Sequence, residues 1–170
     1  GISLWAITTQ NEPFDGLLPN FTFNCLGFTA EEMRDFIKTD LGPALVNAGY
    51  PIEKLKVITM DDQRPFINKW ANTVLKDANA TKYVSGLGIH WYLDEVTPPT
   101  LLDEVHRDFY DKFLLYTEAC EGSGLFESEK VSLGSWLRGE NYANDIIEVS
   151  LIKTCIVKYF SLILRTFNIM

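Results

Sequence analysis

Two glutamates each follow closely on a short apolar run, and such a pair of carboxyl groups can cleave a glycosidic bond. Glu12 follows ISLWAITT and the polar pair QN, and Glu118 follows KFLLYT. Glycoside cleavage needs one carboxylic acid that protonates the leaving oxygen, and one carboxylate that attacks the anomeric carbon or directs water. A retaining enzyme holds the two about 5 Å apart. Residues so far apart in the sequence reach that distance only if the fold brings them together.

A lone glutamate at the end of an apolar run is commonly a solvated loop residue. The two glutamates are accompanied here by polar and aromatic residues that also follow predicted strands: Asn11, then Asp61, Asp62, Gln63 and Arg64, then His90, Trp91, Tyr92 and Asp94. In barrels of parallel strands, chemistry takes place at the C-terminal ends of the strands. The combined set favours a catalytic site over a solvated surface.

The elements that must position these residues follow one pattern, used four times. Apolar runs rich in β-branched residues at 2–9, 55–60, 84–92 and 112–117 are each followed by a loop and a helical stretch. Buried strands that alternate with helices predict an α/β protein with a parallel sheet, either doubly wound or a (β/α)8 barrel. No glycine-rich nucleotide motif follows the first strand, which favours the barrel.

The predicted helices have recognisable ends. Thr29 and Glu32 form a capping box at the start of the first helix, which ends at Gly49 and Pro51. Three more are predicted, over 65–76, over 99–110 and from 133 onward. The expected apolar stripes contain Leu41, Leu45 and Val46 in the first helix, and Phe66, Trp70 and Val74 in the second.

Composition and charge exclude some classes of partner. The chain has 170 residues and a net charge of −8, with its acidic residues scattered, so we expect no nucleic-acid partner. Its first residues lack the features of a signal peptide. The three cysteines, Cys25, Cys120 and Cys155, predict neither a disulfide framework nor a zinc site. Asn20 and Asn79 begin glycosylation sequons, which are compatible with a secreted or lysosomal protein.

Seven segments, in order, resemble the catalytic region of the glucosylceramidases of glycoside hydrolase family 30. They are GISLWAITTQNEP, GLL, CLGFT, MDDQR, GIHWYLD, TEAC and LGSW, and they run from Gly1 to about Glu148. The resemblance implies a partial (β/α)8 TIM barrel, about strands four to seven with their helices. It implies a retaining β-glucosidase with Glu12 as the acid/base, Glu118 as the nucleophile, and no metal or cofactor. Glu12 should then stay protonated near working pH, and Glu118 ionised.

The same resemblance implies roles for the neighbouring residues. Asn11 would bind the sugar 2-hydroxyl, and His90, Trp91 and Tyr92 would line the glucose pocket, with the Tyr92 hydroxyl orienting the nucleophile. Gln63 and Arg64 match a polar loop at the pocket rim, although Arg64 could equally be a structural ion-pair residue. Phe21 and Phe23 match aromatic residues beside the aglycone channel. For each aromatic residue, ordinary packing in the core is the alternative.

The implied substrate is glucosylceramide, cleaved to glucose and ceramide at the lumenal membrane surface of the lysosome with the help of a saposin-like activator and anionic lipids. Two alternatives remain: a non-catalytic half-barrel that binds sugar or lipid, and a relative that acts on another β-glycoside. By the resemblance, strands one to three would precede Gly1.

The end of the chain departs from the family pattern. We therefore predict a catalytic domain over 1–148 and a divergent apolar tail over 149–170 that extends the last helix. Lys153, Lys158 and Arg165 make this tail too charged for a membrane span. An amphipathic helix on a membrane surface is the alternative.

Overall fold

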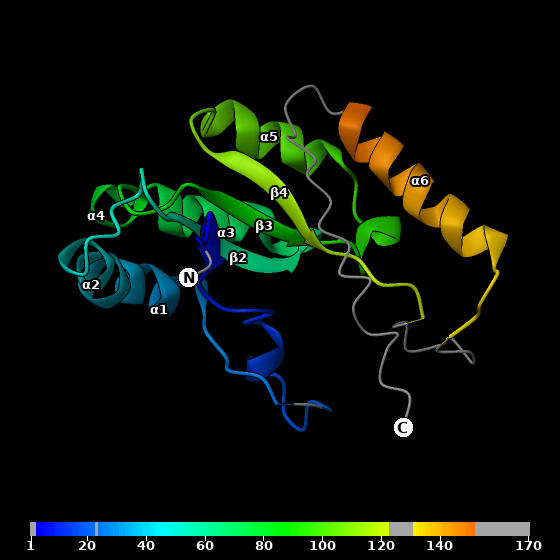
Figure 1. Ribbon diagram of the computed structural model, residues 1–170, viewed down its shortest axis with the longest axis horizontal. Helices are drawn as coiled ribbons and strands as arrows, with labels where there is room; N and C mark the ends of the chain where they lie inside the picture. Colours follow the sequence, from blue (N-terminus) through cyan, green and yellow to red (C-terminus); the bar gives the residue numbers. More distant parts are fainter. Residues whose placement is uncertain (1–2, 23, 123–130, 152–170) are drawn as a thin grey trace.

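Four parallel strands form a single sheet in which spatial order follows chain order. A computed structural model describes residues 3–22, 24–122 and 131–151 (Figure 1). The strands are β1 (Ala6–Thr8), β2 (Lys56–Gln63), β3 (Gly86–His90) and β4 (Phe113–Glu118), and the sheet order is β1-β2-β3-β4. A doubly wound sheet reverses its order at a switch point, whereas a barrel adds strands one after another. The observed order is that of a barrel.

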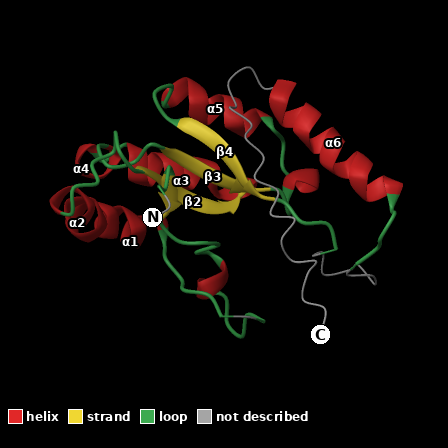
Figure 2. Ribbon diagram, in the orientation of Figure 1, coloured by secondary structure: helices red, strands yellow, loops and turns green. Residues whose placement is uncertain are grey.

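Helices connect the strands, as the sequence predicts (Figure 2). Between β1 and β2 lie η1 (Asp15–Leu17), α1 (Ala30–Phe36), η2 (Ile37–Leu41) and α2 (Gly42–Asn47). Between β2 and β3 lie η3 (Arg64–Phe66), α3 (Ile67–Trp70), η4 (Ala71–Leu75) and α4 (Ala78–Thr81). Between β3 and β4 lie η5 (Asp94–Val96) and α5 (Thr100–Asp108), and α6 (Trp136–Leu151) follows β4.

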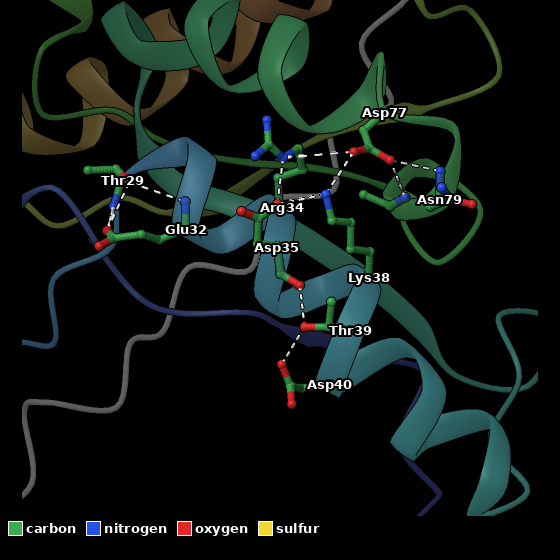
Figure 3. A network of polar contacts seen from close by, with 10 residues as sticks. Thr29, Glu32, Arg34, Asp35, Lys38, Thr39, Asp40, Asp77 and Asn79 are labelled. Carbon is green, nitrogen blue, oxygen red and sulfur yellow. Dashed lines mark hydrogen bonds and ion pairs between the residues drawn. The ribbon is translucent and has the colours of Figure 1, made fainter.

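The start of α1 is fixed by the predicted capping box (Figure 3). The Glu32 backbone N–H donates to the Thr29 hydroxyl oxygen at 3.2 Å, and the Thr29 backbone N–H donates to the Glu32 carboxylate at 2.8 Å. Farther along, Lys38 donates to Asp77 at 3.2 Å. Asp77 caps the start of α4, so this ion pair joins the helical segment after β1 to the one after β2.

The core lies between the sheet and these helices, and one predicted apolar stripe is wrong. Val46 is 46% exposed, while Met33 and Ile37, thirteen and nine residues earlier, are completely buried. The segment η2 is a π-helical turn, which inserts extra residues per turn and rotates the residues after it relative to the face that Met33 occupies. The second predicted stripe is confirmed, because Trp70 and Val74 are buried and Phe66 packs against the same core.

The helix α6 leaves large apolar side chains in contact with solvent. It lies beside α5, away from α1 and α2 (Figure 1). Trp136 is 78% exposed, and Leu137 and Ile147 are also exposed, although Val149 reaches the core. Within the described part of the chain, no helix combines the length and apolar character that crossing a membrane requires. Residues 152–170 of the predicted tail lie outside the described residues.

Candidate active site

The carboxyl edge of the sheet collects the polar residues that follow each strand. Glu12 lies in the turn after β1 with a positive φ of 42°, a conformation that is uncommon for residues other than glycine. Its backbone N–H donates to the Asp61 carbonyl on β2 at 2.9 Å. Strain of this kind persists where surrounding contacts impose it, and it is concentrated at functional sites.

The fold brings the two predicted catalytic glutamates together. A carboxylate oxygen of Glu12, one of Glu118 and a ring nitrogen of His90 all lie within 4.8 Å of one another. That spacing is close to the ~5 Å of retaining glycosidases and shorter than the roughly 6.5–9.5 Å of inverting ones. Glu12 is buried and Glu118 is partly exposed.

His90 lies between two carboxylates. Its Nδ1 is 2.9 Å from Glu12 Oε1, and its Nε2 is 3.3 Å from Asp61 Oδ1. Burial lowers the pKa of His90, but the bonds to Asp61 and Glu12 outweigh it and raise the pKa to about 10. At neutral and acidic pH the ring is therefore an imidazolium, which donates from both nitrogens.

The expectation that Glu12 stays protonated is wrong for this structure. Burial raises its pKa, but the hydrogen bond and positive charge of His90 reverse the effect, and the net direction is downward. The neighbouring carboxylates do not overcome an imidazolium 2.9 Å away. Glu12 is therefore ionised here at neutral pH.

Asp61 belongs to the site, although the sequence analysis gave it no role. The register between β2 and β3 shifts between Met60 and Asp62, and both Met60 and Asp61 have positive φ. This bulge turns the Asp61 side chain toward His90. Asp61 Oδ1 also accepts the Thr117 hydroxyl at 2.6 Å, and a Cβ on Gly88 would lie 2.8 Å from the same oxygen. Glycine at position 88 keeps this space open.

Two further acidic residues surround Glu12. Asp15 lies in the turn of η1, shares a side-chain hydrogen bond with Glu12, and has its pKa raised to about 7 by burial and by the Glu12 charge. Asp62 accepts the backbone N–H of Phe14 at 3.0 Å, and burial raises its pKa to about 6. The sequence signal for Asp15 was its position three residues after Glu12, in the turn that follows NEP.

Two other predicted residues contact the glutamates directly. Gln63 Nε2 donates to Glu12 Oε1 at 2.9 Å. The Tyr92 hydroxyl donates to Glu118 Oε1 at 2.7 Å, the contact expected of a residue that orients the nucleophile. Their proposed roles toward a sugar stay predictions.

Trp91 and Arg64 have partners elsewhere. The Trp91 ring stacks on Tyr142 of α6, with ring centres 4.7 Å apart and an interplanar angle of 12°. Arg64 is completely buried and pairs with Asp94; its guanidinium also donates to the Tyr116 hydroxyl, the Thr97 carbonyl and Glu148. This network favours the ion-pair interpretation of Arg64.

The remaining predicted residues lie on loops. Asn11 is exposed beside Glu12, and Phe21 is partly exposed in the loop after η1. Both sequon residues, Asn20 and Asn79, are exposed. Phe23 and Cys155 lie outside the described residues.

Glu12, His90 and Glu118 also have residue types and spacing that could hold a metal ion. In this arrangement both nitrogens of His90 already face carboxylates, so metal binding would require His90 to lose a proton and to break its contact with Glu12. The expected absence of a metal and of a cofactor stays a prediction.

Comparisons with known proteins agree with this geometry. The profile of the glycosyl hydrolase family 30 TIM-barrel domain matches residues 1–164. Lysosomal acid glucosylceramidase of Mus musculus is 47% identical over 148 residues, which cover 86% of this chain. The chain spans 28% of the length of that relative. The crystal structure of SrfJ from Salmonella typhimurium aligns with a TM-score of 0.72 and 25% identity over 92% of this chain and 32% of SrfJ. The predicted partial barrel and the predicted family resemblance are confirmed.

Proposed function

Because this chain belongs to glycosyl hydrolase family 30, we propose that it carries the catalytic pair of a retaining β-glucosidase. The approach of the Glu12 and Glu118 carboxylate oxygens to within 4.8 Å carries the proposal. The Tyr92 hydroxyl supports the assignment of Glu118 as nucleophile, because a donor at 2.7 Å stabilises the ionised carboxylate and directs its free oxygen.

The proposed reaction has two steps. Glu12 protonates the glycosidic oxygen while a carboxylate oxygen of Glu118 attacks the anomeric carbon, which releases the aglycone alcohol and leaves a glycosyl ester on Glu118. Glu12 then takes a proton from water, whose oxygen attacks the anomeric carbon and frees Glu118. Asn11 would bind the sugar 2-hydroxyl.

The first step needs a proton on Glu12, which this structure holds ionised. We expect a bound sugar and additional barrel wall to exclude water from Glu12 and so raise its pKa. Asp15 shares a side-chain hydrogen bond with Glu12 and carries its proton at mildly acidic pH, so a proton source lies beside Glu12, whereas His90 retains its own proton.

The substrate proposed for the whole protein is glucosylceramide. Support comes from the relative in Mus musculus, which is named a lysosomal acid glucosylceramidase. The same name supports a lysosomal location. A lumenal membrane surface with anionic lipids, a saposin-like activator, glycosylation at Asn20 or Asn79, and an aglycone channel beside Phe21 and Phe23 belong to this proposal.

A second candidate function follows from the small fraction of its relatives' length that this chain spans. With 28% of that length, the chain by itself would be a non-catalytic half-barrel that binds sugar or lipid. A related enzyme acting on another β-glycoside is the third candidate. Turnover of glucosylceramide against other β-glucosides distinguishes these cases.

The test uses the full-length gene product that contains this chain and a cyclitol epoxide, which labels the nucleophile of retaining β-glucosidases. Glu118→Gln should abolish labelling, whereas Glu12→Gln should slow turnover and leave labelling measurable. Asp40→Asn, an exposed change outside the site, is the control. Equal labelling of the two glutamine variants would contradict the assigned roles.

A further inference from the structure

Asp61, on β2, has contacts at or next to both predicted catalytic glutamates. The Asp61 carbonyl accepts the backbone N–H of Glu12 at 2.9 Å. The Asp61 carboxylate faces His90, whose other nitrogen faces the Glu12 carboxylate. The same oxygen of Asp61 accepts the hydroxyl of Thr117, the residue before Glu118. Asp61 therefore joins the turn after β1 to β3 and β4 at the site.

These contacts leave the His90 ring little freedom. An imidazole with an acceptor at each nitrogen is fixed in rotation, since turning the ring would break a hydrogen bond to one of two carboxylates. In serine-protease triads a buried aspartate fixes a histidine in the same way. Asp61 is itself constrained by the Thr117 hydroxyl, the β-bulge and its left-handed backbone.

We propose that Asp61 is a positioning residue that holds His90 between the sheet and the site, so that the ring presents its Nδ1–H to Glu12. The reach of Asp61 to β4 also fixes the strand that carries Glu118, and this keeps the two glutamates at their observed separation. The assignment of a catalytic task to that separation rests on the proposed function.

The titratable groups around His90 are Asp61 and Asp62 from β2, Glu12 from the turn after β1, Asp15 from η1, Glu118 from β4, and Tyr92, whose ring lies edge-on at 6.1 Å. Removing the charge of Asp61 leaves Glu12 as the only ionised carboxylate, among the described residues, that is hydrogen-bonded to the ring. With asparagine at position 61 the proton on Nε2 faces a neutral amide instead of a carboxylate, so the imidazolium loses part of its stabilisation.

The test is a titration of ¹⁵N-histidine-labelled chain, residues 1–170, at a dilution where it is monomeric. The chain has two histidines, so His106 serves as an internal reference. In the unsubstituted protein we expect His90 to carry protons on both nitrogens at pH 7. Asp61→Asn should lower the His90 pKa by about 1–3 units and leave the His106 resonance unchanged. Asp40→Asn removes an exposed carboxylate and should change neither.

An unchanged His90 titration in Asp61→Asn, or an equal change in Asp40→Asn, overturns the proposal. If Asp61→Asn does not fold, the titration of the unsubstituted protein still tests the proposal, because a His90 Nε2 without a proton at pH 7 would overturn it. Epoxide labelling of the full-length product remains a separate readout. Labelling without the NMR shift would refute the positioning role alone, and the NMR shift without labelling would refute the β-glucosidase alone.

Discussion

At the scale of single residues, the charges of this protein are organised in two buried clusters. One surrounds His90, and the other surrounds Arg64, which is completely buried. Burial raises the pKa of Asp94 to about 7, even though Arg64 lies beside it and lowers that pKa. The stability of this buried cluster therefore depends on the geometry of the Arg64 guanidinium, which donates to four acceptors.

Replacing Arg64 by methionine should be strongly destabilising. Methionine fills much of the same space but leaves the Tyr116 oxygen and the Thr97 carbonyl without their donor and Asp94 without its positive partner. Breaking a buried pair costs about 3–5 kcal/mol. Urea unfolding followed by circular dichroism measures the loss. Arg107→Met, at an exposed pair with Asp108, is the matched control and should change the free energy of unfolding by less than ~0.5 kcal/mol. Equal losses in the two variants would contradict the assignment of a structural role to Arg64.

At the scale of elements, the close approach of two strands leaves no room for a side chain at one position of β3. A Cβ on Gly86 of β3 would lie 2.3 Å from the Phe113 carbonyl oxygen of β4. A backbone atom in a paired strand cannot move aside as a flexible side chain does. The pairing that places Glu118 next to His90 therefore depends on the absence of a side chain at position 86.

Gly86→Ala should weaken the pairing of β3 with β4 and cost about 1–3 kcal/mol, the usual range for overpacking. Gly139→Ala is the control, because a Cβ there has no neighbour within 4 Å and alanine favours the helix by about 1 kcal/mol. Thermal unfolding of both variants gives the comparison. A Gly86→Ala protein as stable as the unsubstituted one would show that β3 and β4 can separate at no cost.

The sequence predicts an element where the local pattern of residues determines it, and fails where contacts with distant residues decide. The four strands and the capping box at Thr29 follow from local patterns, and the structure has them in place. The end of β2 does not follow, because its apolar run stops at Met60 while the strand continues to Gln63. Buried polar residues at a site look like a loop in the sequence.

Asp61 was predicted to follow the strand at the site but was given no role, since a β-bulge, which leaves no mark in the sequence, decides where its side chain points. Val46 was misplaced by a π-helical turn that likewise follows from tertiary packing. The proximity of Glu12 and Glu118 was predicted from the topology of parallel strands, whereas the protonation of Glu12 was wrong because it depends on His90, a partner from another strand. The domain boundary near residue 148 stays a prediction.

At the scale of the whole molecule, most buried ionisable groups retain protons more strongly in the folded state. The pKa values of Asp15 and Asp94 are raised to about 7, those of Asp62 and Asp145 to about 6, and that of His90 to about 10. A group with a raised pKa stabilises the folded state below its unfolded pKa, and this contribution is lost as the pH rises through the folded pKa. Glu12 and Asp61 have lowered pKa values, so the stability that they contribute is lost as the pH falls below ~4.5.

The free energy of unfolding should therefore be highest near pH 4–5 and should fall as the pH rises to 10. The carboxyl groups lose their contribution to stability between about pH 4 and 7, and His90 loses its contribution between about pH 6.5 and 10. Each bound proton changes the free energy of unfolding by up to ~1.4 kcal/mol per pH unit. Urea midpoints at pH 5, 7 and 9 measure the trend. His90→Gln should flatten the part above pH 7, and a stability that rises with pH would contradict the raised pKa values.

The 170-residue chain alone should associate with itself and lack β-glucosidase activity. Among the described residues, β1 and β4 end the sheet without a further strand, and α6 exposes Trp136, Leu137 and Ile147. Open strand edges and apolar patches promote association. Size-exclusion chromatography at increasing concentration and a fluorogenic β-glucoside at acidic pH measure both properties. Trp136→Lys should reduce association, and a monomeric chain that turns over more substrate than its Glu118→Gln variant would contradict the prediction.

The stacking of Tyr142 on Trp91 has a consequence for ligand access. An indole ring has two faces, and α6 occupies one of them through Tyr142. A sugar that stacks on Trp91 has only the opposite face available, and one that needs the covered face must compete with the last helix. The position of α6 therefore sets which side of Trp91 a carbohydrate can approach.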